Sequence, residues 1–233
     1  MIRFDHVSKR FSGQNDALSD ITVQIPDGEF VFLIGPSGAG KTTFLRLLIR
    51  DILPTKGDVH VDDWNVHTMP SSKVHLLRRK IGTVFQDFKL LTDRTVFENV
   101  SLGLEIAGKK NEDIVTRVAD VLELVGLSGK HRYFPRELSA GEMQRTGIAR
   151  AIVAGPSIVL ADEPTGNLDP ETAWEIFTIL SEINKMGTTV VMATHNASMV
   201  NDMKKRTISL LHGKVESDEV SGRYRVAKHS KKT

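Results

Sequence analysis

Short apolar runs separated by turn residues dominate the first third of the chain, and this pattern predicts β-strands. The runs are rich in β-forming residues and end at turn signals such as Pro26-Asp27-Gly28. The run Phe30–Ile34 is apolar at every position, which is typical of a strand buried on both faces of a sheet. The strands predicted here are Ile2–Val7, Ile21–Ile25, Phe30–Ile34 and Val59–Asp62.

The middle of the chain follows a helical pattern instead. One helix is predicted from the apolar positions Ile114, Val118, Val121, Leu122 and Val125, which recur at helical spacing, with Gly126 near its end. A second helix is predicted over Ser139–Val153. Strands are predicted before and after this region at Ile81–Phe85, Ile158–Ala161, Thr189–Ala193 and Thr207–Leu211.

Two further helices are predicted from the residues at their starts. The run Lys41–Arg50 follows a glycine-rich loop, which itself follows the strand Phe30–Ile34. The tripeptide Asp169-Pro170-Glu171 combines a capping residue, a proline at the first helical position and an acid in the first turn. The sequence therefore predicts an α/β fold whose sheet is interrupted by a helical subdomain at about residues 87–153.

Composition limits the class of protein. Hydrophobic residues make up 40% and charged residues 26%, as in an ordinary globular protein. The chain contains no cysteine, which rules out a thiol nucleophile or a thiolate metal site. The formal net charge of +2 is too small to indicate nucleic acid as the main partner.

Neither a membrane span nor a signal peptide is predicted, because the longest apolar run is Phe30–Ile34 and charged residues interrupt the N-terminus. Any membrane role is expected to come through a partner. Residues 1–222 are predicted to form one domain, and residues 223–233 a basic tail with five basic residues and no acidic one. The tail has two open interpretations, a solvated end or a contact with anionic lipid headgroups.

The segment from Gly35 to Thr42 is a complete G-x-x-x-x-G-K-T phosphate-binding loop, or P-loop. Its backbone N–H groups and the following helix N-terminus are suited to phosphate, which predicts a nucleoside triphosphate as the ligand. Lys41 is expected to reach the β- and γ-phosphates, and the Thr42 hydroxyl is expected to bind Mg²⁺. The predicted nucleotide-binding residues here are Gly35, Pro36, Ser37, Gly38, Ala39, Gly40, Lys41, Thr42 and Thr43.

The apolar run Ile158–Ala161 ends in two adjacent carboxylates, Asp162 and Glu163. Side chains alternate direction along a strand, so the two acids are expected to face different ways. Asp162 is the predicted metal ligand. Glu163 is the predicted general base that polarises the attacking water. The alternative is a pair of exposed acids at a strand end, which a neighbouring P-loop makes less favourable.

Several further motifs occur in a fixed order, and together they resemble the ATP-binding cassette (ABC) family over the chain up to about Gly222. Leu138-Ser139-Ala140-Gly141-Glu142 is similar to the family signature. The other resembling positions are Phe11 for the adenine-stacking aromatic, Gln86 for the Q-loop, Gly166-Asn167-Leu168-Asp169 for the D-loop and His195 for the switch histidine.

The resemblance implies a P-loop NTPase fold with a mixed sheet core, an inserted helical subdomain and an antiparallel β region near the N-terminus. It implies that Ser139 and Gly141 bind the γ-phosphate held by a second subunit, in a head-to-tail homodimer with two ATP molecules. Gln86 is expected to sense Mg²⁺ and the attacking water, His195 to hydrogen-bond the γ-phosphate, and the D-loop Asp169 to contribute to the nucleotide site.

Three positions depart from the family pattern. Ala140 stands where the signature has glycine, Met143 where close relatives have glutamine, and Asn196 where an aspartate commonly follows the switch histidine. Alanine adds a methyl group beside the expected γ-phosphate and disfavours a positive φ. We therefore expect slow but measurable hydrolysis, and the alternative is a site that binds ATP with almost no turnover.

The segment Leu77–Val100 resembles more narrowly the ATPases of the bacterial cell-division complex. This implies a peripheral location on the cytoplasmic side of the cell membrane, a transmembrane partner with four helices, and control of peptidoglycan hydrolases. Lipoprotein-releasing and macrolide-type or peptide-export ATPases of the same branch are the alternative. Residues around the Q-loop are open to two interpretations, core or a groove for the partner's helix: Arg78, Arg79, Phe85, Phe88, Leu90 and Leu91.

Other classes fit less well. Soluble ABC proteins of translation need two cassettes, and this chain has one P-loop and one signature. The DNA-repair type needs a long coiled coil between these motifs, and no sustained heptads occur there. A nucleotide sensor without catalysis stays open because of Ala140, and a purely structural role is least favoured because scaffolds have no need of a phosphate and metal site.

Overall fold

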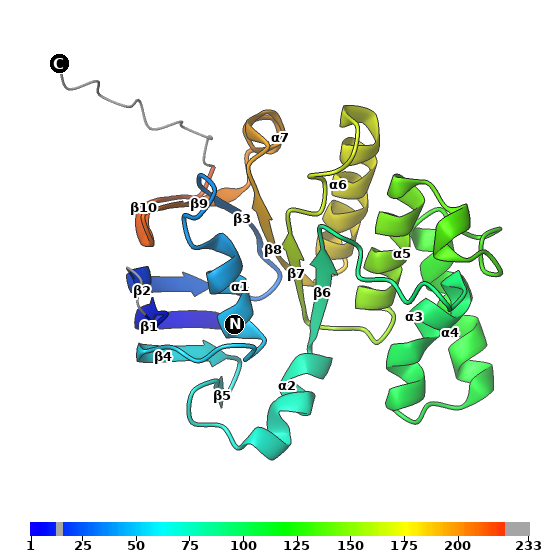
Figure 1. Cartoon of the computed structure of the whole chain (residues 1–233), viewed down its shortest axis with the longest axis horizontal. Helices are drawn as coiled ribbons and strands as arrows, with labels where there is room; N and C mark the ends of the chain where they lie inside the picture. The colour runs from blue at the N-terminus through cyan, green and yellow to red at the C-terminus, as the bar shows by residue number, and fades with distance from the viewer. Residues whose placement is uncertain (13–15, 222–233) are drawn as a thin grey trace.

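The computed structural model describes residues 1–12 and 16–221, which form two sheets and a set of helices (Figure 1). The predicted basic tail, residues 223–233, lies outside the described residues. No helix in the described ranges is long and apolar enough to cross a membrane.

An antiparallel sheet lies near the N-terminus, as the family resemblance implies. Its strand order is β2-β1-β4-β5, and β1 pairs with both β2 and β4. Register shifts along β1 bend this sheet, with left-handed residues His6 and Asp20 at the irregular positions. The bounds are β1 (Ile2–Arg10), β2 (Asp16–Ile25), β4 (Lys56–Val61) and β5 (Trp64–Asn65).

The main sheet has the order β10-β9-β3-β8-β7-β6. All neighbouring pairs are parallel except β10 with β9, so the sheet is mixed, as expected. Strand β3 lies inside the sheet and is buried at every residue. The bounds are β3 (Phe30–Ile34), β6 (Ile81–Phe85), β7 (Ile158–Asp162), β8 (Thr189–Thr194), β9 (Arg206–Leu211) and β10 (Lys214–Glu219).

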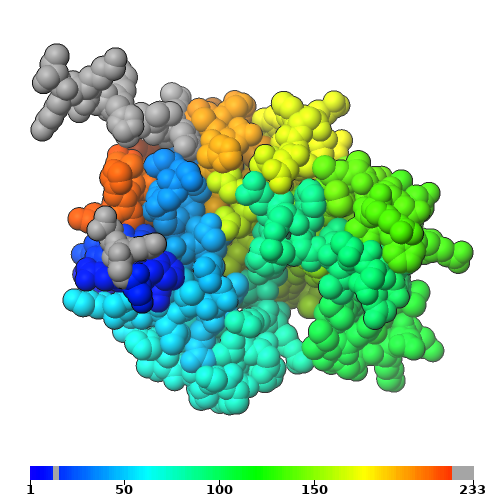
Figure 2. All heavy atoms as spheres, viewed as in Figure 1, coloured from blue at the N-terminus to red at the C-terminus, as the bar shows by residue number. Residues whose placement is uncertain are grey.

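The helices fall into two groups. Those of the main body are α1 (Lys41–Leu48), α2 (Val74–Arg79), α6 (Pro170–Lys185) and α7 (Ala197–Met203), with a 3₁₀ turn at Ser71–Lys73. The helical subdomain contains α3 (Val96–Ile106), α4 (Asn111–Leu124) and α5 (Ala140–Ile152), with a 3₁₀ turn at Pro135–Glu137. In the space-filling view the subdomain (green) forms the side of the molecule opposite the N-terminal sheet (blue) (Figure 2).

Two apolar cores hold these layers together. One joins the N-terminal sheet and α1 to the main sheet, and its Phe4 and Phe44 rings stack with centroids 4.0 Å apart. The other joins the opposite face of the main sheet to α6 and the helical subdomain, around Phe32 and Phe177. Each apolar side chain buried in this way contributes about 1.5–3 kcal/mol.

The predicted fold class is confirmed, with differences at the edges of elements. The helix predicted to reach Arg50 ends at Leu48, and Arg50 is left-handed. The strand predicted at Val59–Asp62 runs over Lys56–Val61 instead. The structure adds β5, α2, α3, α7 and β10, for which we predicted no element. Strand β10 pairs at the sheet edge with a mostly polar sequence, so no apolar run announces it.

Candidate functional site

The P-loop connects the buried strand β3 to helix α1, as the sequence predicts. Gly35 has a φ of 149°, and a Cβ there would lie 2.3 Å from the Leu210 carbonyl oxygen on β9. Gly40 has a φ of 109°, and its Cβ would lie 2.7 Å from the Ala17 carbonyl oxygen on β2. Both glycines are therefore required by close backbone packing, in addition to the tight turn.

Helix α1 begins at Lys41, and its capping residue Gly40 offers no side-chain cap. Its first N–H groups are left for a ligand, and the positive end of the helix dipole favours an anion there. The Lys41 side chain folds back over the loop, and its ammonium donates to the carbonyl oxygens of Gly35 at 2.8 Å and Pro36 at 3.3 Å. Cation and N–H groups thus converge on one position, which suits a phosphate.

Glu163 follows directly after β7 and connects two of the predicted site residues. One of its carboxylate oxygens lies 3.4 Å from the Lys41 ammonium, and the other lies 2.7 Å from Nδ1 of His195. Glu163 adopts a left-handed conformation with a φ of 49°, which costs a non-glycine residue about 1–2 kcal/mol. Its own N–H holds this turn by donating to the Ala193 carbonyl oxygen at 3.0 Å.

Asp162 lies at the end of β7, partly buried beneath the P-loop helix. Burial raises the pKa of the Asp162 carboxyl, and the nearby Glu163 charge acts in the same direction. A hydrogen bond with Thr42 and the charge of Lys41 oppose this rise. Within the described residues, Oδ1 of Asp162 is buried without a hydrogen-bond partner.

An unpaired buried carboxylate oxygen beside a threonine hydroxyl fits a magnesium ion. Mg²⁺ takes oxygen ligands and is typically held by one or two carboxylates together with substrate phosphates and water. In the ranges that the structure describes, no group of three or more His, Cys, Asp or Glu side chains is arranged around a metal position. The donor set at Asp162 and Thr42 therefore fits a metal that arrives with a nucleotide.

The predicted Q-loop and D-loop lie against each other. The side-chain amide of Gln86 donates to Oδ1 of Asn167 at 3.5 Å, and the Asn167 amide donates back to the Gln86 carbonyl oxygen at 3.3 Å. Gln86 itself is exposed and reaches the cavity described next. The apolar residues on both sides of Gln86 are only partly covered: Phe85, Phe88 and Leu90 are half-buried and Leu91 is 40% exposed.

These residues surround a cavity of about 570 Å³. Ten predicted positions from four separate segments line it, and Ala17 of β2 joins them although no motif points to that residue. The lining residues are Ala17, Ser37, Gly38, Ala39, Gly40, Lys41, Thr42, Thr43, Gln86, Glu163 and His195. Gly40 is the last residue of the loop and also the capping residue of α1.

Two predicted nucleotide residues, Ser139 and Gly141, are not among the residues that line this cavity. Ser139 is exposed and caps α5, since its side chain accepts from the Glu142 N–H at 3.2 Å while the Glu142 carboxylate accepts from the Ser139 N–H at 2.9 Å. This box lowers the pKa of Glu142. Ala140 is also exposed, and it is helical. Its backbone therefore does not need the positive φ that alanine disfavours.

Asp169 and Phe11 also lie outside the residues that line the cavity. Asp169 is the predicted cap of α6, and its carboxylate accepts from the Thr172 N–H at 3.0 Å and hydroxyl at 2.6 Å. These bonds lower the pKa of Asp169. Phe11 is half-buried just after β1, and the Lys9 ammonium lies 5.1 Å from the centre of its ring.

The fold and the site together define an ATPase of the ABC class. Residues 18–166 match the family model described as ABC transporter. Among solved structures, a dimeric post-hydrolysis state of the ATP-binding cassette MJ0796 bound to ADP and Pi matches with a TM-score of 0.86 and 34% identity. The match covers 96% of this chain and 100% of that one. A second dimeric MJ0796 structure matches equally well, at 35% identity.

Curated relatives narrow the class. The cell division ATP-binding protein FtsE of Bacillus subtilis is 51% identical over 96% of this chain and 98% of its own length. FtsE of Mycobacterium tuberculosis is 52% identical with the same coverage. FtsE of Escherichia coli K12 is 45% identical over 92% of this chain and 99% of its own length. The chain therefore belongs to the FtsE family of cell-division ATP-binding proteins, which are ABC ATPases.

Proposed function

We propose that the chain binds Mg-ATP in the P-loop cavity and hydrolyses it there. The P-loop N–H groups and Lys41 hold the β- and γ-phosphates, while Thr42 and Asp162 hold the metal, with Gln86 beside it. Glu163 is the general base, since its carboxylate lies in the cavity within reach of the Lys41 ammonium. His195 hydrogen-bonds the γ-phosphate. Bound magnesium would supply charge neutralisation on the phosphate oxygens.

The binding of nucleotide has to rearrange the pairs present without it. Without nucleotide, the Lys41 ammonium pairs with the Glu163 carboxylate, and this carboxylate also contacts His195. A γ-phosphate offers Lys41 a stronger anion, so the ammonium would turn from the carboxylate to the phosphate. The same step would release Glu163 to accept a proton from water.

The observation that carries the proposal is the division of the site residues into two separate surfaces. The P-loop, Gln86, Glu163 and His195 share one cavity, whereas Ser139 and Ala140 lie exposed at the N-terminus of α5. One copy of the chain therefore lacks the second half of a nucleotide site. We propose that a second copy completes it head to tail, with two ATP molecules between the subunits, and Asp169 and Phe11 are assigned to the edges of that site.

A cellular role follows from the relatives. We propose that the dimer docks on an FtsX-like transmembrane protein at the cytoplasmic face of the membrane. There, ATP cycling would control peptidoglycan hydrolases on the other side. The half-buried and exposed apolar residues after Gln86 support a docking surface at this place: Phe88, Leu90 and Leu91.

The first experiment is the Glu163→Gln variant, which keeps the size of the side chain and removes its basicity. We expect phosphate release to fall by about 100-fold or more. With ATP and magnesium, we expect this variant to form a stable dimer by light scattering. Glu112→Gln, an exposed residue at the start of α4, is the matched control and should behave as wild type. Unchanged phosphate release by Glu163→Gln would exclude this residue as the base.

The partner is tested with the same variant as an ATP-locked bait in native membranes. Recovery of a four-span protein with a large external domain would support the FtsX-like partner. Recovery of a lipoprotein- or peptide-export permease would leave the ATPase assignment in place and replace the proposed partner.

A further inference from the structure

The segment 87–95, which directly follows Gln86, has an unfavourable backbone at its start. Phe88 and Lys89 have φ values of 60° and 49°, two successive left-handed residues without a glycine. Side chains with a Cβ disfavour this conformation, which persists only where surrounding groups hold it. The segment therefore needs anchors from outside itself.

Arg150 of α5 supplies the first anchor. One guanidinium nitrogen donates to the Lys89 carbonyl oxygen at 2.7 Å and the other donates to the Phe88 carbonyl oxygen at 3.0 Å. A single planar group thus holds the carbonyls of both left-handed residues. In the described part of the chain, the acceptors of this guanidinium are these two carbonyl oxygens.

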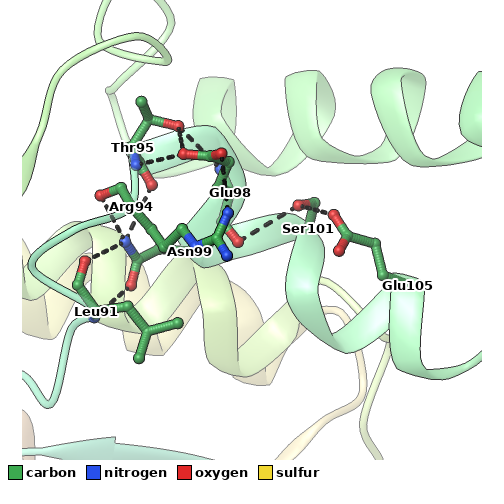
Figure 3. Close-up of polar contacts among 7 residues, drawn as sticks. All are labelled: Leu91, Arg94, Thr95, Glu98, Asn99, Ser101 and Glu105. Carbon is green, nitrogen blue, oxygen red and sulfur yellow. Dashed lines mark hydrogen bonds and ion pairs between the residues drawn. The ribbon is translucent and has the colours of Figure 1, made fainter.

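Asn99 of α3 supplies the second anchor (Figure 3). Its side chain is fully buried. Its oxygen accepts from the Leu91 N–H at 2.8 Å, and its amide donates to the carbonyl oxygens of Leu91 at 3.0 Å, Arg94 at 3.1 Å and Thr95 at 3.0 Å. Two N–H groups serve three acceptors, so one bond is shared. One amide therefore closes the turn from Leu91 to Thr95 onto the helix.

This anchor is separate from the start of α3. The cap of α3 is a box between Thr95 and Glu98, in which the Glu98 carboxylate accepts from the Thr95 N–H at 2.7 Å. The helix has its own cap, so the bonds from Asn99 to Leu91 and Arg94 serve the segment and not the helix.

We propose that Asn99 and Arg150 are positioning residues for ATP hydrolysis, which act through Gln86. Both belong to the helical subdomain, and together they make segment 87–95 part of that body. Gln86 then lies between two attachments: the subdomain on one side and Asn167 of the D-loop on the other. With the segment anchored, a shift of the subdomain would move Gln86 relative to the γ-phosphate. With the segment loose, the same shift would not be transmitted to Gln86.

The inference rests on the role proposed for Gln86. The test measures steady-state hydrolysis by the purified full chain for Asn99→Ala and Arg150→Lys. We expect kcat to fall by about 10-fold or more, because small misplacements of a catalytic group are costly. KM for ATP should stay within about 2-fold of wild type, since the P-loop is untouched. Hydrogen exchange at the Leu91 N–H should become faster in Asn99→Ala.

Ser101→Ala is the matched control on the same helix. Its hydroxyl contacts the Glu105 carboxylate at 2.5 Å and does not reach the segment (Figure 3). This variant should hydrolyse ATP as wild type does. If Asn99→Ala fails to fold, Arg150→Lys still tests the proposal, because lysine keeps the charge and loses the two-pronged contact.

The deciding measurement repeats both variants in a Gln86→Ala background. If the anchors act through Gln86, neither Asn99→Ala nor Arg150→Lys should cause a further loss of kcat in the Gln86→Ala background. An equal loss in both backgrounds would overturn the inference and assign the anchors a general structural role. Wild-type kcat in Gln86→Ala alone would instead remove the role proposed for Gln86, so the two failures are distinguishable.

Discussion

Asp162 and Glu163 are neighbours in the sequence but have different surroundings. Asp162 is the last residue of β7 and has a buried oxygen without a partner in the described part of the chain. Glu163 leaves the strand in a left-handed turn and pairs with Lys41 and His195. Without ligand, the Asp162 carboxylate is therefore costly to ionise, whereas the Glu163 carboxylate already has the Lys41 ammonium beside it.

The cost at Asp162 predicts a gain in stability from Asp162→Asn. Without nucleotide, we expect the variant to unfold at a temperature about 2–4 °C higher at neutral pH, for a gain of about 1 kcal/mol. A raised pKa in the folded state means that the wild type loses stability as pH rises through that pKa. The difference between the proteins should therefore vanish near pH 4 and grow toward pH 7 in thermal melts.

The same substitution should remove the proposed magnesium ligand. Magnesium should then no longer increase the affinity of the variant for ATP, measured by titration with and without the metal. A variant that is less stable than wild type at neutral pH would contradict the explanation based on an unpaired buried carboxylate.

At the scale of elements, the signature helix α5 and helix α6 approach each other closely. A Cβ on Gly141 would lie 2.5 Å from Cγ2 of Thr172. Thr172 cannot rotate freely, because its hydroxyl is bonded to the Asp169 carboxylate at 2.6 Å. The glycine of the signature therefore also has a structural reason to be small, apart from any contact with nucleotide.

Gly141→Ala is accordingly expected to destabilise the protein by about 1–3 kcal/mol through overpacking, measured by denaturant unfolding. Thr172→Ser removes Cγ2 and keeps the hydroxyl bond to Asp169. In that background, Gly141→Ala should be neutral or stabilising, because alanine favours the helix by about 1 kcal/mol over glycine. Equal destabilisation in both backgrounds would show that another contact decides.

At the scale of the whole molecule, the proposed ATP site is divided between two separate surfaces of the chain, one of which a second copy would supply. Ser139 lies exposed at the N-terminus of α5, outside the cavity that contains Lys41 and Glu163. A substitution at Ser139 therefore acts on the proposed dimer without touching the nucleotide cavity of its own chain.

Ser139→Asp and Ser139→Asn form a matched pair for this test. Both residues cap helices well, so both variants should stay within about 1 kcal/mol of wild type in stability. The aspartate places a negative charge against the partner's γ-phosphate, and we expect ATP-dependent dimerisation to be lost and hydrolysis to fall by about 10-fold or more. The asparagine variant should retain dimerisation, and both should bind ATP as monomers with unchanged affinity. If the aspartate variant dimerises as well as the asparagine variant, the proposed head-to-tail dimer with ATP at the interface is excluded.

Local sequence accounts for the elements with strong signals of their own. The apolar runs at β3 and β6 have the predicted ends, and the cap at Asp169 starts α6 as predicted. Elements such as β10 were missed because their apolar residues are few and their stability comes from pairing with a neighbour. The slow hydrolysis expected from Ala140 stays a prediction. It rests on the methyl group of Ala140 alone, because the backbone of this residue is helical and does not need a positive φ.

The sequence by itself determined the chemistry: a complete P-loop, two acids after an apolar strand, and the family motifs in order. These signals are local, because contiguous residues form each motif. Only the tertiary structure decided that Gln86 lies against Asn167, that Glu163 holds Lys41 and His195, and that Asn99 and Arg150 anchor the segment after Gln86. Those contacts join residues far apart in the chain, and they depend on how strands and helices pack, which no local pattern specifies.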